Sequence, residues 1–309
     1  MTTRLCIGLL ASAFCACLSG PTPAQTSDGP INDGAVTDAL VSDAIAADAL
    51  VNDAVASANT HAYNFPGSGR NYFFVSANGA NTVDLNGTVT FETWFKLGAI
   101  PAVGERFALF IKSDDAASSS KNYGFAIKNI SGELWIVSEM DGTLPVGGNA
   151  SDKAGVSWPG LGIGDWHHVA VTYDIAKLTV AERFSFYRDG TLVPTTIKLS
   201  AQEPIALIRK SVTTDVTIGA RVSGDVQTNQ LNGILDEIRL WSIVRSPSAI
   251  LSSRDTELNG GNAGLLGYWQ LDSDTGFTST HDHSGNDNDL GILGEVDSGF
   301  ESVDEHAPF

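Results

Sequence analysis

Residues 184–193 read FSFYRDGTLV, and this stretch decides the fold class. Two runs rich in aromatic and β-branched residues flank the pair Asp189-Gly190. A two-residue type I′ turn requires such a pair, because both of its central residues adopt positive φ. The stretch therefore predicts a β-hairpin that turns at Asp189 and Gly190.

Runs of the same kind recur on both sides of this hairpin, separated by turn residues. They are TVTFETWFK (88–96), FALFIK (107–112), YGFAIK (123–128), GELWIVSEM (132–140), WHHVAVTYD (166–174), DVTIGA (215–220), GILDEIRLW (233–241) and LLGYWQLD (265–272). The sequence indicates one helix, over residues 246–250, where Ser246 can cap the helix and Pro247 suits its first position. Many short strands with almost no helix predict an all-β sandwich, jelly roll or barrel over residues 62–309.

The composition narrows the range of functions. The 309 residues include 18 Lys and Arg against 36 Asp and Glu, a formal net charge of -18. Nucleic acid is excluded as a partner, because its binding depends on cationic side chains that neutralise phosphates. Hydrophobic residues make up 42% of the chain, which is enough for a packed core and excludes an intrinsically disordered protein.

The first residues have the pattern of an export signal. Arg4 precedes an apolar run that holds all three cysteines of the chain and is too short to span a bilayer. One interpretation is a signal peptide over residues 1–17 with lipidation of Cys17, which ends the lipobox-like motif FCAC. It predicts a lipoprotein of the outer membrane or cell surface. The other interpretation, cleavage near residue 24, predicts a secreted protein.

Residues 18–61 form an acidic linker of pentapeptide repeats. They contain no Lys or Arg, and an Asp recurs every five residues from Asp28 to Asp53. A five-residue step advances about 140° around an α-helix, so the repeat leaves no apolar stripe to bury. We expect a solvated, partly helical tether that its charges keep extended and that holds the domain away from a membrane.

The order and spacing of the strand segments resemble the laminin-G-like jelly rolls of the concanavalin A-like lectin and glucanase superfamily. The matching segments are FETWFK, GDWHHVAVTYD, FYRDGTLV, TIGARV, NGILDEIRLWSIVRSPSAI, GLLGYWQLD and DHSGNDNDLGILG, between residues 62 and about 296. The resemblance implies a two-sheet antiparallel jelly roll used for carbohydrate or protein recognition, often with a calcium ion at its rim. It does not imply one ligand, because this fold hosts lectins, enzymes and adhesion modules.

The carboxylates argue against catalysis. Glycosidases of this superfamily carry Glu-x-Asp-x-Glu on one strand, which projects alternate carboxylates into the cleft, and the chain has no such triplet. In GILDEIRLW, strand alternation places Asp236 and Glu237 on opposite faces. Asp236 is then expected to share a face with Ile238 and Leu240. We expect it to be a structural carboxylate, satisfied by backbone N–H groups or by an Arg.

Calcium is the cofactor that the resemblance implies, and the C-terminal segment offers oxygen ligands for it. Residues 255–309 hold 12 acidic residues and no Lys or Arg. Within the stretch DHSGNDND the expected ligands are Asp282, Asn286, Asn288 and, as a fourth, Asp289. Asn71 stands at a position where family members carry an acidic residue, and it could contribute its amide oxygen. The alternative is that these residues only form turns and keep the protein soluble.

Two tryptophans are candidate ligand-binding residues, because aromatic rings stack on the apolar faces of sugars. Trp158 lies in the Gly- and Pro-rich loop AGVSWPGLGIG (154–164), whose tip could project from the domain. The alternative for Trp158 is a loop anchor that folds back onto the sandwich. Trp135, on the predicted strand 132–140, is the second candidate.

The sequence thus predicts a non-catalytic recognition domain outside the cytoplasm, with calcium as a stabilising ion. Its expected partner is a glycan or a cell-surface protein, and its expected contact with a membrane is the lipid anchor alone. Two alternatives stay open. One is a structural or adhesion module that docks onto another protein, and the less favoured one is a polysaccharide-degrading enzyme.

Overall fold

The structure is a computed structural model and describes residues 59–77, 83–113, 121–194, 197–198, 204–211, 213–224, 226–272, 279–295 and 298–309. The predicted signal peptide, Cys17 and all but the last three residues of the acidic linker lie outside this part of the chain. The described residues belong to one compact unit that spans Ala44–Phe309. Within them, no helix is long and apolar enough to cross a membrane.

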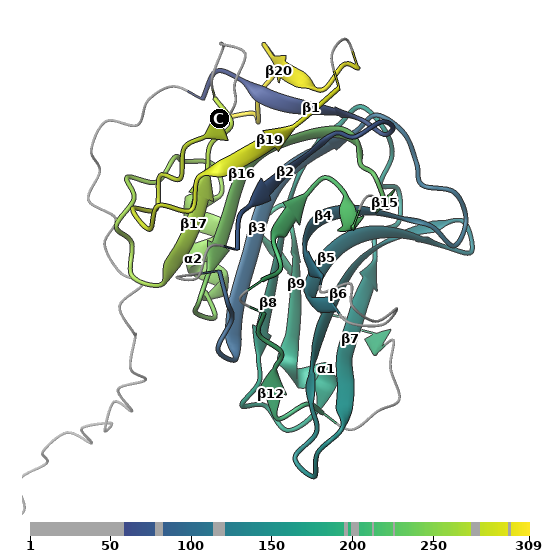
Figure 1. Cartoon of the computed structure of the whole chain (residues 1–309), viewed down its shortest axis with the longest axis vertical. Helices are drawn as coiled ribbons and strands as arrows, with labels where there is room; N and C mark the ends of the chain where they lie inside the picture. Colours follow the sequence, from purple (N-terminus) through teal and green to yellow (C-terminus); the bar gives the residue numbers. More distant parts are fainter. Residues whose placement is uncertain are drawn as a thin grey trace, which may run out of the picture. The chain divides into compact units, whose positions relative to one another are not determined.

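Two antiparallel sheets form the domain (Figure 1). Sheet A has eight strands, seven of which lie in the order β10 (Thr191–Val193), β9 (Phe184–Arg188), β8 (Trp166–Asp174), β3 (Thr88–Leu97), β16 (Asn232–Trp241), β1 (Ala62–Pro66) and β20 (Glu301–Val303). The eighth, β17 (Leu265–Trp269), pairs with β16.

Sheet B has ten strands. Nine lie in the order β11 (Ile197–Lys198), β7 (Asn149–Ser157), β6 (Glu133–Thr143), β5 (Lys121–Ile130), β4 (Arg106–Ser113), β13 (Val216–Ile218), β2 (Tyr72–Val75), β19 (Leu290–Leu293) and β18 (Ser279–Thr280). The tenth, β12 (Leu207–Ile208), pairs with β6, and a separate two-stranded ribbon joins β14 (Arg221–Ser223) to β15 (Val226–Thr228).

The all-β, two-sheet antiparallel jelly roll that the sequence predicts is confirmed. The hairpin predicted at Asp189 and Gly190 is confirmed as well, because Arg188 of β9 pairs with Thr191 of β10. The two residues between them have φ angles of 48° at Asp189 and 76° at Gly190, as a type I′ turn requires.

Two short helices accompany the sheets. The predicted helix is α2 (Pro247–Ser253), which Ser246 caps by accepting a hydrogen bond from the backbone N–H of Ala249. The expectation of a single helix was wrong, because α1 (Val180–Arg183) precedes β9. Its first turn is fixed by a capping box between Thr179 and Glu182, which the spacing Thr-x-x-Glu could have indicated.

The core lies between the sheets and is rich in aromatic side chains. Phe91 of β3 stacks on Phe125 of β5, with ring centroids 4.6 Å apart. Trp269 of β17 and Phe110 of β4 make a second contact across the core, at 5.9 Å. All four side chains are fully or almost fully buried, and each large apolar side chain removed from water stabilises the fold by about 1.5–3 kcal/mol.

β16 pairs with more strands than its neighbours do. One of its edges pairs with β3 along nearly its whole length. The other edge is shared, since β1 pairs with Asn232–Leu235 and β17 pairs with Ile238–Trp241. β16 therefore holds the first and the later segments of the domain in one sheet.

A β-bulge interrupts β16 at Glu237, which has a φ of 52°. The extra residue reverses the alternation, so Ile238 and Leu240 pack in the core. Asp236 and Glu237 both lie on the outer face of sheet A, the face turned away from sheet B, and are 0% and 1% exposed. The predicted opposite placement of these two acids was therefore wrong, as was the predicted shared face of Asp236 and Leu240. Both predictions assumed an unbroken strand.

A buried carboxylate connects the two sheets. Asp152 of β7 is 0% exposed and accepts hydrogen bonds from the hydroxyl of Tyr173 on β8 and from Arg183 of α1, at 2.8 and 2.6 Å. It also accepts from the backbone N–H of Ile205. Sheet B, sheet A and the segment before β12 thus meet at one side chain.

Replacing Asp152 with Ala is expected to lower the free energy of unfolding by about 3–5 kcal/mol, because Arg183 would stay buried without its carboxylate. Urea unfolding followed by tryptophan fluorescence measures this. The matched control is Tyr173→Phe, which removes the two hydrogen bonds of the hydroxyl, to Asp152 and from Arg183, but keeps the ion pair, and should cost about 2 kcal/mol. Equal losses in the two variants would contradict the importance of the ion pair.

Candidate functional site

Four strands of sheet B, β4 to β7, lie side by side (Figure 1). Their face that is turned away from sheet A carries polar side chains. The pairing of these strands sets side chains in rows across the sheet. Lys128 of β5 lies between Arg106 of β4 and Trp135 of β6. In a parallel row, Glu139 of β6 lies between Gly124 of β5 and Lys153 of β7.

The row between these two holds small side chains. Val137 of β6 pairs with Ala126 on one side and with Gly155 on the other. Small side chains between two rows of long ones leave a hollow with a volume of about 260 Å³. Its lining consists of Arg106, Ile111, Gly124, Ala126, Lys128, Val137, Ser138, Glu139 and Lys153.

The hollow is cationic although the chain as a whole is strongly acidic. Three of its lining residues are basic, and Glu139 is the one acid among the described residues that line it. Glu139 forms ion pairs with Arg106, at 3.6 Å, and with Lys153. In the part of the chain that the structure describes, Lys128 has no ion-pair partner. The hollow can therefore attract an anionic group and donate several hydrogen bonds to it.

Trp135 lies on the same face, at the rim of this hollow. It is two residues from Val137 on β6 and opposite Lys128, and its ring is partly exposed. Its indole Nε1 is buried and has no hydrogen-bond acceptor among the described residues. The structure thus brings this candidate beside a group of basic residues that the sequence reasoning missed. The alternation of side chains along the predicted strands YGFAIK and GELWIVSEM could have indicated these residues. It places Lys128, Trp135 and Glu139 at outward positions.

Trp158 does not project from its loop, so the projecting tip was a wrong expectation, and the alternative, a loop anchor that folds back onto the sandwich, is confirmed. Its backbone N–H donates to Leu134 of β6, which continues the pairing of β7 by one residue and turns the ring inward, like Val156 before it. The ring is 6% exposed and packs edge-on against Phe95 and His167. It is an anchor of the core and offers no platform to a ligand.

The residues expected to bind calcium in the stretch 282–289 use their polar atoms for internal hydrogen bonds. Asp282 is 1% exposed. Its Oδ1 accepts from the backbone N–H groups of Tyr268 and Ser284, and its Oδ2 accepts from the Ser284 hydroxyl and the Asn288 N–H. Four donors leave this carboxylate little capacity for a cation.

The other expected ligands do not converge on Asp282 either. The side-chain amides of Asn286 and Asn288 donate to the carbonyls of Leu265 and Leu266, and Asp289 accepts from the backbone N–H of Asp282. Asn71 lies at the opposite end of the β2–β19 pair, where its Oδ1 accepts from the backbone N–H of Glu295. The loop is therefore held by its own turns, and Asp282 has little capacity left for a cation.

A buried ion-pair network lies on the outer face of sheet A, beneath α2. Glu92 of β3 is 0% exposed and accepts a hydrogen bond from Arg245 at 2.8 Å, while His168 of β8 lies 3.6 Å from its other oxygen. Arg245 also donates to Ser253 of α2. Burial works to raise the pKa of Glu92, but Arg245 and His168 outweigh it and lower this pKa to about 2.

Glu92 is expected to make the fold sensitive to acid. Its carboxyl has a lower pKa in the folded chain than the ordinary value of 4.5, so its stabilisation is complete above pH 4.5 and is lost as the pH falls towards 2. Urea unfolding over a pH series should show this loss. Glu92→Gln should be less stable at neutral pH and should show a weaker dependence on acid. An unchanged slope in the variant would contradict the assignment.

Comparisons with known proteins agree with this architecture. The family model described as the concanavalin A-like lectin/glucanases superfamily matches residues 67–251. No curated protein matches the chain. A candidate carbohydrate-binding protein from Bacteroides ovatus has a similar fold, with a TM-score of 0.53 and 17% sequence identity. That match covers 76% of this chain and 58% of the Bacteroides ovatus chain. This chain therefore spans less than two thirds of the length of that protein.

Two further solved structures are more distant. The CBM40 domain of the IT-sialidase from Ruminococcus gnavus has a TM-score of 0.43 and 14% identity, and the match covers 62% of this chain and 95% of that one. Domains LG4-5 of the mouse laminin alpha1 chain have a TM-score of 0.38 and 14% identity. That match covers 63% of this chain and 46% of the laminin chain.

Proposed function

This chain belongs to the concanavalin A-like lectin/glucanases superfamily, and on that premise we propose that it binds carbohydrate at the hollow on the outer face of sheet B. The observation that carries the proposal is the hollow itself, in which Arg106, Lys128 and Lys153 surround a floor of small residues. The carbohydrate-binding role suggested for the Bacteroides ovatus protein of similar fold accords with it.

The charge of the hollow favours an acidic glycan, one that carries carboxylate or sulfate groups. Hydrogen bonds between charged partners contribute about 1.5–3 kcal/mol each, more than those between neutral groups. Glu139 would accept hydrogen bonds from sugar hydroxyls while it holds two of the basic side chains in place. The partly exposed ring of Trp135 offers an apolar surface at the rim for a neighbouring sugar.

We infer a binding role without catalysis. Glycoside hydrolysis requires two carboxyl groups on either side of the scissile bond, and the described lining of the hollow has Glu139 alone. The sequence also lacks the Glu-x-Asp-x-Glu pattern of the superfamily's glycosidases.

The first test is binding of the purified protein to carboxylated, sulfated and neutral oligosaccharides on a glycan array, at low and at high salt. Acidic glycans should bind. High salt should weaken their binding, because it screens the interaction between exposed charges. Lys128→Ala should lower the affinity by about tenfold or more, which corresponds to the loss of one charge-assisted hydrogen bond. The matched control is Lys177→Ala, an exposed lysine before α1.

Three results would contradict this assignment. They are a preference for neutral glycans, binding that salt does not affect, and an equal effect of the two lysine variants. Binding to no glycan at all would favour the alternative of an adhesion module that docks onto another protein.

We also infer that the protein acts outside the cytoplasm, because of the export pattern in residues 1–17. In a bacterial host the mature chain should begin at a lipid-modified Cys17, which intact-mass measurement detects. Cys17→Ser should abolish both the added mass and recovery in the membrane fraction. A mature chain that begins near residue 25 without added lipid would instead establish secretion.

A further inference from the structure

One ion pair crosses the hollow from one row of long side chains to the other. Arg106 of β4 and Glu139 of β6 lie on strands that are separated by β5. Arg106 lies opposite Lys128, and Glu139 lies opposite Gly124, four residues away along β5. With strands about 4.8 Å apart and a rise of about 3.3 Å per residue, the two backbones are about 16 Å apart. The Arg106 nitrogen nevertheless lies 3.6 Å from the Glu139 oxygen, so both side chains extend across the floor.

Small residues on β5 make this crossing possible. Ala126 lies between the two rows, and Gly124 lies directly opposite Glu139. A Cβ atom added at Gly124 would meet only Ile111, at 3.4 Å, so the glycine leaves space on this side of Glu139. Larger side chains at these two positions would stand in the path between Arg106 and Glu139. The row of small residues therefore allows the two rows of long side chains to meet over the hollow.

The two members of this ion pair are held unequally. Glu139 also pairs with Lys153, its direct neighbour on β7. In the part of the chain that the structure describes, Glu139 is the one ion-pair partner of Arg106, at a distance too long for a hydrogen bond. The Arg106 side chain is 28% exposed, and ion pairs in contact with water contribute little to stability. Arg106 can therefore leave Glu139 at low cost, while Glu139 stays with Lys153.

We propose that the carboxylate of an acidic sugar displaces Glu139 as the partner of Arg106, and that Glu139 then selects a sugar with free hydroxyl groups beside that carboxylate, as in a uronic acid. This inference rests on the proposed glycan site and names the class of acidic sugar that the site takes. The guanidinium of Arg106 binds a planar carboxylate through two parallel N–H groups, so a sugar carboxylate can take the place of the Glu139 side chain. Lys128, opposite Arg106, supplies a second cation to the same group.

Glu139 sets the specificity because it stays in the hollow as an anion beside Lys153. Its oxygens accept hydrogen bonds from sugar hydroxyls, but they repel a second acidic group of the ligand. A sugar whose hydroxyls carry sulfate would place such a group against Glu139. Interfaces commonly reject a wrong partner through a like charge of this kind. The hollow is thus expected to take a sugar with one carboxylate and to reject a densely sulfated one.

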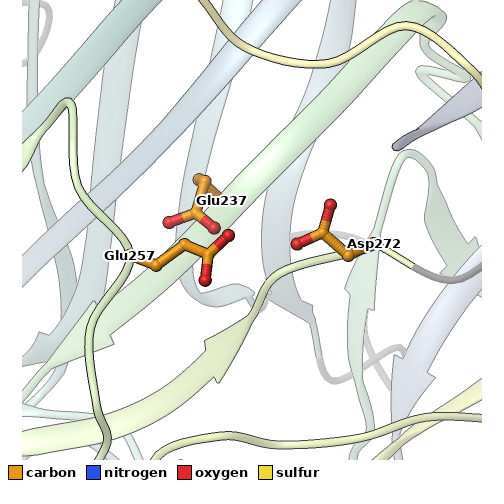
Figure 2. Close-up of side chains that lie close together, drawn as sticks. All are labelled: Glu237, Glu257 and Asp272. Carbon is orange, nitrogen blue, oxygen red and sulfur yellow. The ribbon is translucent and has the colours of Figure 1, made fainter. Parts of the chain in front are cut away.

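The other acids of the domain that lie close together are on the far side of the sandwich. Figure 2 shows Glu237, Glu257 and Asp272 at the outer face of sheet A, where one oxygen from each lies within 4.8 Å of the others. They do not contact a ligand in the hollow. Of the described residues that line the hollow, Glu139 alone can repel a second anion.

The test compares two probes that differ only in sulfation: the tetrasaccharide of galacturonic acid, and the same tetrasaccharide with its hydroxyls sulfated. Isothermal titration calorimetry at one salt concentration should show that the wild-type protein binds the unsulfated probe at least about tenfold more tightly. In Glu139→Gln the sulfated probe should gain about tenfold, so the preference should disappear, because the amide accepts hydrogen bonds without repelling an anion.

A second variant separates the ion pair with Arg106 from the charge of Glu139. Glu139→Asp keeps the charge, but its side chain is one methylene shorter and loses contact with Arg106. It should still reject the sulfated probe. It should bind the unsulfated probe up to about threefold more tightly, because Arg106 no longer has to leave a partner. Circular dichroism checks that each variant folds.

The matched control is Glu133→Gln, which removes an exposed acid at the start of the same strand, outside the lining of the hollow, and should leave the preference unchanged. The proposal is overturned if the wild-type protein binds both probes equally, if Glu139→Gln keeps the preference, or if Glu133→Gln removes it as well. In each of these cases the proposed glycan site still stands, provided that acidic glycans bind and Lys128→Ala weakens them. Binding of no acidic glycan would overturn both proposals.

Discussion

β16 pairs with β3 along one edge and with both β1 and β17 along the other, and its bulge at Glu237 lies between these two shorter pairings. The bulge keeps Leu235, Ile238 and Leu240 in the core on both sides of an extra residue. It also turns two neighbouring acids to the outer face. The packing of the sandwich and the burial of these two acids therefore depend on one local change of strand geometry.

The two outer faces of the sandwich carry different chemistry. On sheet B, regular alternation over β4 to β7 places long basic side chains in rows that flank a row of small residues, and a hollow results. On sheet A, the outer face is covered by α2 and by the segments around β17, so its charged groups are buried and must be paired. An open basic hollow suits a soluble anionic ligand.

Much of the fold was predictable from local sequence. The Asp189-Gly190 turn, the cap at Ser246 and the two-residue alternation of the strands act over a few positions, so they are readable in a single chain. For Trp158 the sequence left a projecting loop tip and a buried anchor open, and the anchor holds because the pairing of β7 continues through this residue, which precedes a proline. Alternation, extended from Ala154 and Val156, would have placed the ring in the core.

The candidate sites were less predictable, since they depend on contacts between distant segments. The hollow requires the register that sets Gly124 and Lys153 on either side of Glu139, and no local pattern fixes that register. The shared outer face of Asp236 and Glu237 requires a bulge that the sequence GILDEIRLW does not show. The loop from Asp282 to Asp289 has the composition of a calcium site, but its donors and acceptors satisfy one another.

We propose that the hollow between β4 and β7 receives an acidic sugar. A ¹H–¹⁵N correlation spectrum of the protein titrated with an acidic oligosaccharide tests this residue by residue. We expect progressive shifts of the Trp135 indole N–H and of the backbone signals of Gly124 and Ala126, with the residues on the outer face of sheet A unchanged. Shifts confined to other parts of the domain, with the signals of the hollow unaffected, would contradict it.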